Sequence, residues 1–157
     1  MAFGKITQAL AIPLEATASY TFHRFQLCDA GPPTLVCRHA GDGTPTFQSA
    51  LVRAVNIDRQ RNAGRPPDRN VTPAKIKSGA IDEAKLIADH CVLGWANVYD
   101  DGDPTPTPCT PAKVLELLTT VIEATDGLAQ YRAFSAWIQD SDTFRPPQGD
   151  TAELGKA

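Results

Sequence analysis

The sequence contains no long apolar run and no recognisable export signal. No stretch of its 157 residues approaches the roughly 18 consecutive apolar residues of a membrane-spanning helix. The first ten residues carry one lysine, but Gly4, Thr7 and Gln8 interrupt the apolar core that a secretory signal needs. We therefore expect a protein without a membrane partner.

Familiar catalytic motifs are also missing from the sequence. It has no G-x-S-x-G, no H-E-x-x-H and no phosphate-binding G-x-x-x-x-G-K pattern. Asp89, His90 and Cys91 are consecutive, but neighbours on a helix point in different directions and cannot form a catalytic triad. These absences favour a protein that is not an enzyme and has no catalytic residues.

The cysteines lack the spacing of a metal site. Cys28, Cys37, Cys91 and Cys109 show no short C-x₂₋₄-C pattern, although Cys37 and His39 would share one side of a strand. We predict buried free thiols, no metal and no cofactor, because free cysteine is among the most buried residue types. Two alternatives remain open: a Cys28–Cys37 disulfide, and a small metal-binding protein or enzyme that uses the Cys/His set.

The overall composition is that of a globular domain. A hydrophobic content of 42% with 21% charged residues allows a substantial core, and 157 residues favour a single domain. The net charge of −3 makes nucleic acid an unlikely partner for the molecule as a whole. We expect an extended arm over residues 1–18, one α+β domain over 19–144 and a flexible, polar tail over 145–157.

Two segments near the start of this domain predict a β-hairpin. Residues 19–28 are rich in aromatic and β-branched types, and residues 34–39 follow after a loop that contains Gly31 and two prolines. A sheet of two strands is not stable alone, so it must pack on helices or on a partner.

Apolar spacing of three and four residues predicts about four helices after the hairpin. The first has an apolar stripe that we expect to face the core, and it ends near Asn62. The second begins at Thr72-Pro73, has a weak point at Gly79 and ends at Gly94. The third follows Thr110-Pro111, and a last aromatic helix covers 128–138, with Phe144 as an anchor. The apolar stripe of the first helix comprises Phe47, Ala50, Leu51, Ala54 and Val55. The predicted fold class is α+β and mostly helical, with an N-terminal hairpin packed on these helices.

Residues 92–111 form the connector around which we expect the helices to assemble. Its acidic turn is not an EF-hand, because position 12 counted from Asp100 is Pro111 where the motif needs glutamate. An Asp-Gly turn is the simpler interpretation. Trp95 and Tyr99 should lie on one face of the segment and join helix packing to a bound partner.

Charge is divided between two blocks of the chain. Residues 53–77 are mainly basic, and residues 82–103 are mainly acidic. Such blocks are usually solvated surface, but they also suit contact between copies or with a partner of complementary charge. Nucleic acid at the basic loop is less favoured, because no aromatic residue interleaves with its arginines. The residues that we assign to partner binding are Trp95, Tyr99, Arg59, Arg61, Arg65, Arg69, Asp100, Asp101 and Asp103.

Three segments carry a resemblance to a known group of proteins. They are PTLVCRHAGDGTPTFQSALVR at 33–53, VLGWANVYDDGDPTPTPCTPAKVLELL at 92–118 and FSAWIQDSDTF at 134–144. Together they resemble small structural and assembly proteins of tailed bacteriophages, the group that includes tail assembly chaperones. Those proteins have a hairpin followed by helices, an acidic turn after a tryptophan, and a final aromatic helix ending in phenylalanine.

The resemblance implies a non-enzymatic role in a phage particle. It implies binding to other phage structural proteins, either capsid or tail subunits, and the charge blocks add copies of the same chain as a further candidate partner. The protein would be a capsid decoration, cement or minor structural subunit, or a tail or connector component, located in the virion and assembled in the cytoplasm of the bacterial host. The alternative is a transient tail assembly chaperone that is absent from the mature virion.

Overall fold

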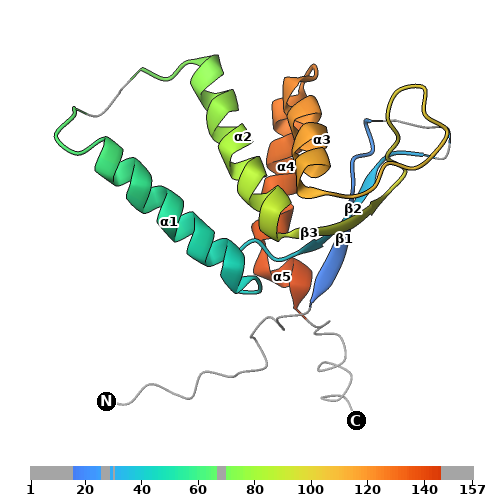
Figure 1. Cartoon of the computed structure of the whole chain (residues 1–157), viewed down its shortest axis with the longest axis horizontal. Helices are drawn as coiled ribbons and strands as arrows, with labels where there is room; N and C mark the ends of the chain where they lie inside the picture. Colours follow the sequence, from blue (N-terminus) through green and yellow to red (C-terminus); the bar gives the residue numbers. More distant parts are fainter. Residues whose placement is uncertain (1–15, 26–28, 30, 67–69, 146–157) are drawn as a thin grey trace, which may run out of the picture.

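The computed structural model describes residues 16–25, 29, 31–66 and 70–145 (Figure 1). Most of the predicted arm and tail lies outside these ranges. The described residues form an antiparallel sheet and five helices, so the protein is α+β and mostly helical, as predicted. In Figure 1 the helices α2, α3 and α4 lie together above the sheet, whereas α1 diverges from α2.

The sheet has three strands in the order β1-β2-β3. The predicted hairpin is confirmed as β1 (Thr17–Thr21) and β2 (Thr34–Arg38), which pair antiparallel with Tyr20 opposite Leu35. β1 is shorter than the predicted strand over 19–28, because the chain turns after Thr21. The buried Phe22 still donates its backbone N–H to the Pro33 carbonyl at 3.0 Å, while the Phe25 N–H bonds back to Phe22.

The third strand, β3 (Val92–Ala96), corrects the prediction that the second helix continues to Gly94. That helix, α2 (Pro73–His90), ends earlier, and Gly94 instead pairs with Val36 of β2. Strand pairing satisfies the backbone groups on the outer edge of β2, which a longer helix would have left without partners. The start of the predicted connector is therefore part of the sheet.

The two helix starts predicted at Thr-Pro pairs show a capping hydrogen bond from the threonine side chain. Thr72 accepts a hydrogen bond from the Lys75 N–H at 3.2 Å at the start of α2, and Thr110 accepts from Lys113 at 3.3 Å at the start of α3 (Pro111–Glu123). Thr44 makes no such bond before α1 (Pro45–Arg61). α2 runs without a break through Gly79.

A tight turn joins α3 to α4 (Gly127–Gln139). Asp126 has a φ of 57°, and a Cβ on Gly127 would lie 1.6 Å from the Val121 carbonyl oxygen. Only glycine permits this approach of the two helices, so the break between α3 and α4 at Asp126-Gly127 has a steric cause.

The core lies where α3 and α4 meet the sheet and α2. The predicted apolar face of α3 is entirely buried. Tyr20 of β1 packs on the rings of Phe134 and Trp137 of α4, with centroid distances of 5.2 and 5.1 Å. The short α5 (Ser141–Phe144) buries Phe144 against Trp137, as expected for an anchor. The buried residues of α3 are Val114, Leu117, Leu118, Val121 and Ile122.

Candidate protein-binding surfaces

The first helix of the protein is almost entirely exposed. Phe47 is the one fully buried residue of α1, at the end where the helix leaves the core. Leu51 and Val55 remain 42% and 48% exposed, and Ala54 is exposed as well. The prediction that the α1 stripe faces the core is therefore wrong beyond Phe47, because α1 diverges from α2 after its first turns (Figure 1).

An open cleft separates α1 from α2. It has a volume of about 640 Å³. Its α1 wall is mainly apolar, with Leu51, Val55 and Ile57 around the small Ala54, and with the charged Asp58 and Arg61 toward the far end. Apolar surface of this kind, on a helix whose residues 51–61 are all exposed, is a mark of a protein-binding site.

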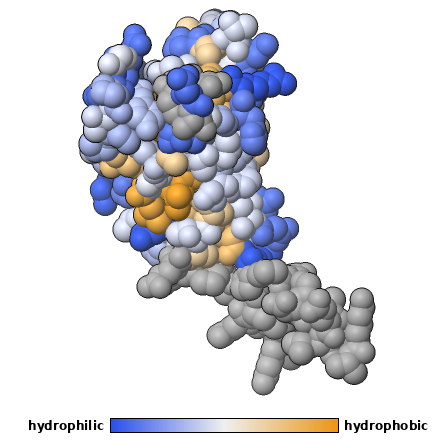
Figure 2. Space-filling view, turned by 90° about the vertical axis from the view of Figure 1, so that its right-hand side faces the viewer, coloured by the Kyte–Doolittle hydropathy of each residue, from blue (hydrophilic) through white to orange (hydrophobic). Residues whose placement is uncertain are grey.

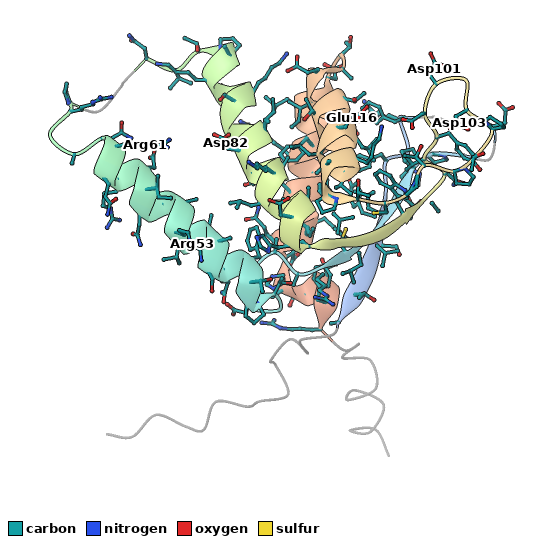
Figure 3. The ribbon with its side chains drawn as sticks, in the orientation of Figure 1. Arg53, Arg61, Asp82, Asp101, Asp103 and Glu116 are labelled. Atoms are coloured by element: carbon teal, nitrogen blue, oxygen red, sulfur yellow. The ribbon has the colours of Figure 1, made fainter. Side chains whose placement is uncertain are left out.

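The α2 wall of the cleft is acidic. It presents Asp82 and Asp89 with Lys85 and Leu86, and Figure 3 shows Asp82 on the side of α2 that faces α1. Glu83 also borders the cleft, but its Oε1 accepts hydrogen bonds from Tyr131 at 2.8 Å and Ser135 at 2.5 Å. The free acidic groups of this wall are therefore Asp82 and Asp89.

The basic residues predicted to bind a partner lie at the end of α1 and just after it. Arg59, Arg61 and Arg65 are exposed, and Arg69 lies outside the described residues. Within the described ranges, no ion pair includes Arg59, Arg61 or Arg65. These guanidinium groups are thus available to a partner.

The acidic residues of the connector are largely engaged within their own loop. Asp100 accepts a hydrogen bond from Lys113 Nζ at 3.2 Å, and Asp103 accepts from the Thr105 N–H at 2.9 Å. The hydrogen bonds from Lys113 to Asp100 and then to Glu116 raise the pKa of the lysine. Asp101 is exposed. The loop behaves as a structured turn rather than as a cluster of free carboxylates.

Trp95 and Tyr99 border one small cavity together with Asp100 and Asp101. Its volume is about 170 Å³, below the range of about 300–1,000 Å³ typical of ligand pockets. Both aromatic residues are half-buried, and Trp95 Nε1 donates a hydrogen bond of 2.7 Å to the Thr107 carbonyl. The Trp95 side chain therefore ties β3 to the later part of the connector at Thr107.

The arginines of α1 and the acidic loop of the connector lie on opposite sides of the molecule. Figure 3 shows Arg53 and Arg61 on one side and Asp101 and Asp103 on the other. The side with the acidic loop is mainly hydrophilic or neutral, apart from a small apolar area (Figure 2). The structure also divides the predicted acidic block over 82–103, because Asp82 and Asp89 border the same cleft as Arg61.

The thiols and the nearby His39 are structural residues of the protein interior. Cys37 and Cys91 are buried, Cys109 is half-buried, and all three are free, as predicted; Cys28 lies outside the described residues. Burial raises the pKa of Cys91 to about 12 and raises that of Cys37 further above its usual range. Neither thiol is therefore an activated nucleophile.

Both ring nitrogens of His39 have protein partners. Nδ1 accepts from the Gly43 N–H at 3.1 Å, and Nε2 lies 3.0 Å from the Gln139 carbonyl, to which it donates. Across the described residues, no group of three or more His, Cys, Asp or Glu side chains could hold a metal ion.

The apolar residues of α1 that lie outside the predicted stripe were missed as binding candidates. Val52 is 59% exposed and Ile57 is 43% exposed. Their positions in the sequence indicated that some apolar residues of this helix would stay exposed, because a helix with apolar residues on several sides cannot bury all of them against one core. The sequence alone did not show which side would lack a neighbour.

None of the helices in the described ranges combines the length and apolar character needed to cross a bilayer. Comparison of the chain with protein-family models, with curated proteins and with solved structures finds no match.

Proposed function

We propose that this protein acts by protein–protein contact, as a structural or assembly component of a tailed-phage particle. The observation that carries the contact role is the cleft side of α1, where Leu51, Val55 and Ile57 are each more than 40% exposed. Exposed apolar side chains scattered singly are ordinary, but three that line one open cleft favour a docking surface.

The phage context comes from the resemblance in residues 33–53, 92–118 and 134–144. These segments supply β2, β3, α5, the first part of α3, the last part of α4 and the first half of α1, so they include much of the core and the root of the exposed helix. This arrangement suits a subunit of an assembly, because a packed body of sheet and helices presents one exposed helix to its neighbours.

The main version of the proposal is a component that stays in the particle, bound to a capsid, tail or connector subunit. The alternative is a tail assembly chaperone that binds during assembly and then leaves. Both versions use the same kind of surface, and they differ in the composition of the finished particle.

Mass spectrometry of purified virions tests the proposal. We expect peptides of this chain in particles that have been freed of host lysate by density-gradient centrifugation. A host protein of similar abundance serves as the contamination control. If the chain is absent from virions but is captured with a tail protein from infected cells, the chaperone version holds instead. If it is found with phage proteins in neither sample, the phage role is wrong.

A pair of variants tests whether the cleft side of α1 is the surface that binds the phage protein. Val55→Glu places a charge on the cleft side of α1 without touching the core, and Val52→Glu places the same charge on the same helix outside the cleft. We expect Val55→Glu to lower incorporation or capture more strongly than Val52→Glu does.

A further inference from the structure

The cleft between α1 and α2 has walls of different chemistry. The α1 wall offers apolar side chains, and the α2 wall offers the carboxylates of Asp82 and Asp89 beside Leu86. An occupant that matches both walls must be a helix with an apolar face flanked by basic residues.

The helix α1 itself has this composition. It carries the apolar residues already described and three arginines against a single acidic residue. The arginines are Arg53, Arg59 and Arg61, and the acid is Asp58. A second α1 could therefore place apolar side chains on the α1 wall and guanidinium groups toward the α2 wall.

We propose that two copies of this chain form a two-fold dimer in which α1 of each copy lies in the α1/α2 cleft of the other. The inference rests on the proposed function, because it names a second copy as the partner of the exposed helix. Under two-fold symmetry each contact occurs twice, and the helices are arranged in the order α2, partner α1, α1, partner α2.

The register of the helix pair follows from the shape of the cleft. α1 and α2 converge where α1 begins and α2 ends, and they diverge toward the other end (Figure 1). Two antiparallel copies of α1 can approach most closely at Ala54, the small residue near the middle of the helix. This register puts Leu51 opposite Ile57 of the second copy, and it puts Arg61 of the second copy near the converging end.

Asp89 lies at that converging end. It borders the cleft one residue before the end of α2, and no ion pair among the described residues includes it. The dimer therefore brings Arg61 of each copy to Asp89 of the other. Within one chain, Arg61 is at the opposite, diverging end of α1.

Sedimentation velocity of the full chain over a wide concentration range is the first test. We expect a species of twice the 16.8 kDa of one chain, which dissociates on dilution. Val55→Glu should weaken this dimer at least about 100-fold, because symmetry introduces the charge into the interface twice. Val52→Glu should weaken it far less, and both variants should keep the circular dichroism spectrum of the native protein.

Charge reversal tests the register. Arg61→Glu and Asp89→Arg should each be monomeric when alone, since each homodimer would contain like charges in contact. A mixture of these two variants should form heterodimers, because both Arg61–Asp89 contacts then join opposite charges. Affinity capture through a tag on one variant measures how much of the other, untagged variant is bound to it in the mixture.

The outcomes separate this inference from the proposed function. A single-chain mass at every concentration, equal dimerisation of Val55→Glu and the native chain, or failure of the mixture to form heterodimers would each overturn the dimer. A monomer that is nevertheless found in virions would leave the phage role in place and assign α1 to a different virion protein. A dimer that is absent from phage samples would support the interface while rejecting the phage role.

Discussion

The hydroxyl group of Tyr131 donates a hydrogen bond of 2.8 Å to Glu83 Oε1 and so joins α4 to α2. The same carboxylate oxygen accepts from Ser135, and Gln139 Nε2 in turn donates to Ser135 Oγ at 2.8 Å. Burial, and then the negative charge of Glu83, raise the pKa of Tyr131. This network orients a glutamate that would otherwise add charge to the α1/α2 cleft.

Tyr131→Phe should therefore destabilise the fold by about 1.5–3 kcal/mol, the usual range for a hydrogen bond to a charged group. Urea unfolding followed by fluorescence gives the change in the free energy of unfolding. Ser78→Ala, at an exposed position of α2, is the control and should stay within about 0.5 kcal/mol of the native chain. A loss for Tyr131→Phe no larger than this control would show that the hydroxyl contributes nothing to stability.

Two glycines should respond in opposite directions to the same substitution. A Cβ on Gly127 would lie 1.6 Å from the Val121 carbonyl oxygen, so Gly127→Ala must separate α3 from α4 and should cost more than about 3 kcal/mol. Gly79 has open space around it in the middle of α2, so Gly79→Ala should stabilise the protein by about 0.5–1 kcal/mol. Thermal unfolding of both variants provides the comparison. Equal effects of the two changes would contradict the close approach at the α3/α4 turn.

Trp95→Ala should cost about 3 kcal/mol, at the lower end of the range for truncating a large aromatic residue, because the ring is half-buried. Trp95→Phe keeps most of the ring but removes the hydrogen bond to the Thr107 carbonyl, and it should cost about 1 kcal/mol. Denaturant unfolding measures both values. If Trp95→Ala leaves stability unchanged but abolishes incorporation into particles, the ring is an interface anchor rather than a structural one.

Stability should fall under alkaline conditions. In the unfolded chain the thiols of Cys37 and Cys91 lose their protons above about pH 8.5, whereas burial keeps them protonated in the folded protein and raises the pKa of Cys91 to about 12. Deprotonation therefore favours the unfolded chain. The contribution of these thiols is complete below about pH 8.5 and is lost as the pH rises toward 12.

Urea midpoints measured from pH 7 to pH 11 test this dependence, for which each thiol contributes up to about 1.4 kcal/mol per pH unit. Cys91→Ala should start from a lower stability but decline less steeply above about pH 9. Identical slopes for the native chain and this variant would show that Cys91 does not titrate on unfolding.

Much of the fold could be predicted because its signals are local. The Thr-Pro pairs at 72–73 and 110–111 start helices by capping, and the apolar spacing of Val114 to Ile122 faces one way on any helix. The hairpin followed from two segments suited to strands on either side of a loop. Phe144 could be predicted as an anchor because it is an isolated aromatic residue in a polar stretch.

The binding surfaces could be predicted less well. Residues 92–96 pair with β2, which is distant in sequence, and local pattern assigned part of them to a helix. Trp95, Tyr99, Asp100 and Asp101 do come together at one cavity, as the connector suggested, but Asp100 is engaged by Lys113 and the arginines are on the other side of the molecule.

The sequence by itself determined the helices, their caps, the hairpin and the free thiols, because each depends on interactions between residues close in the chain or on the residue type alone. Only the tertiary structure decided that β3 completes the sheet and that, among the described residues, the apolar face of α1 is left exposed. An apolar stripe favours a helix that is covered, but α2 packs against α3 and α4 and diverges from α1, so the described part of the chain leaves this stripe exposed.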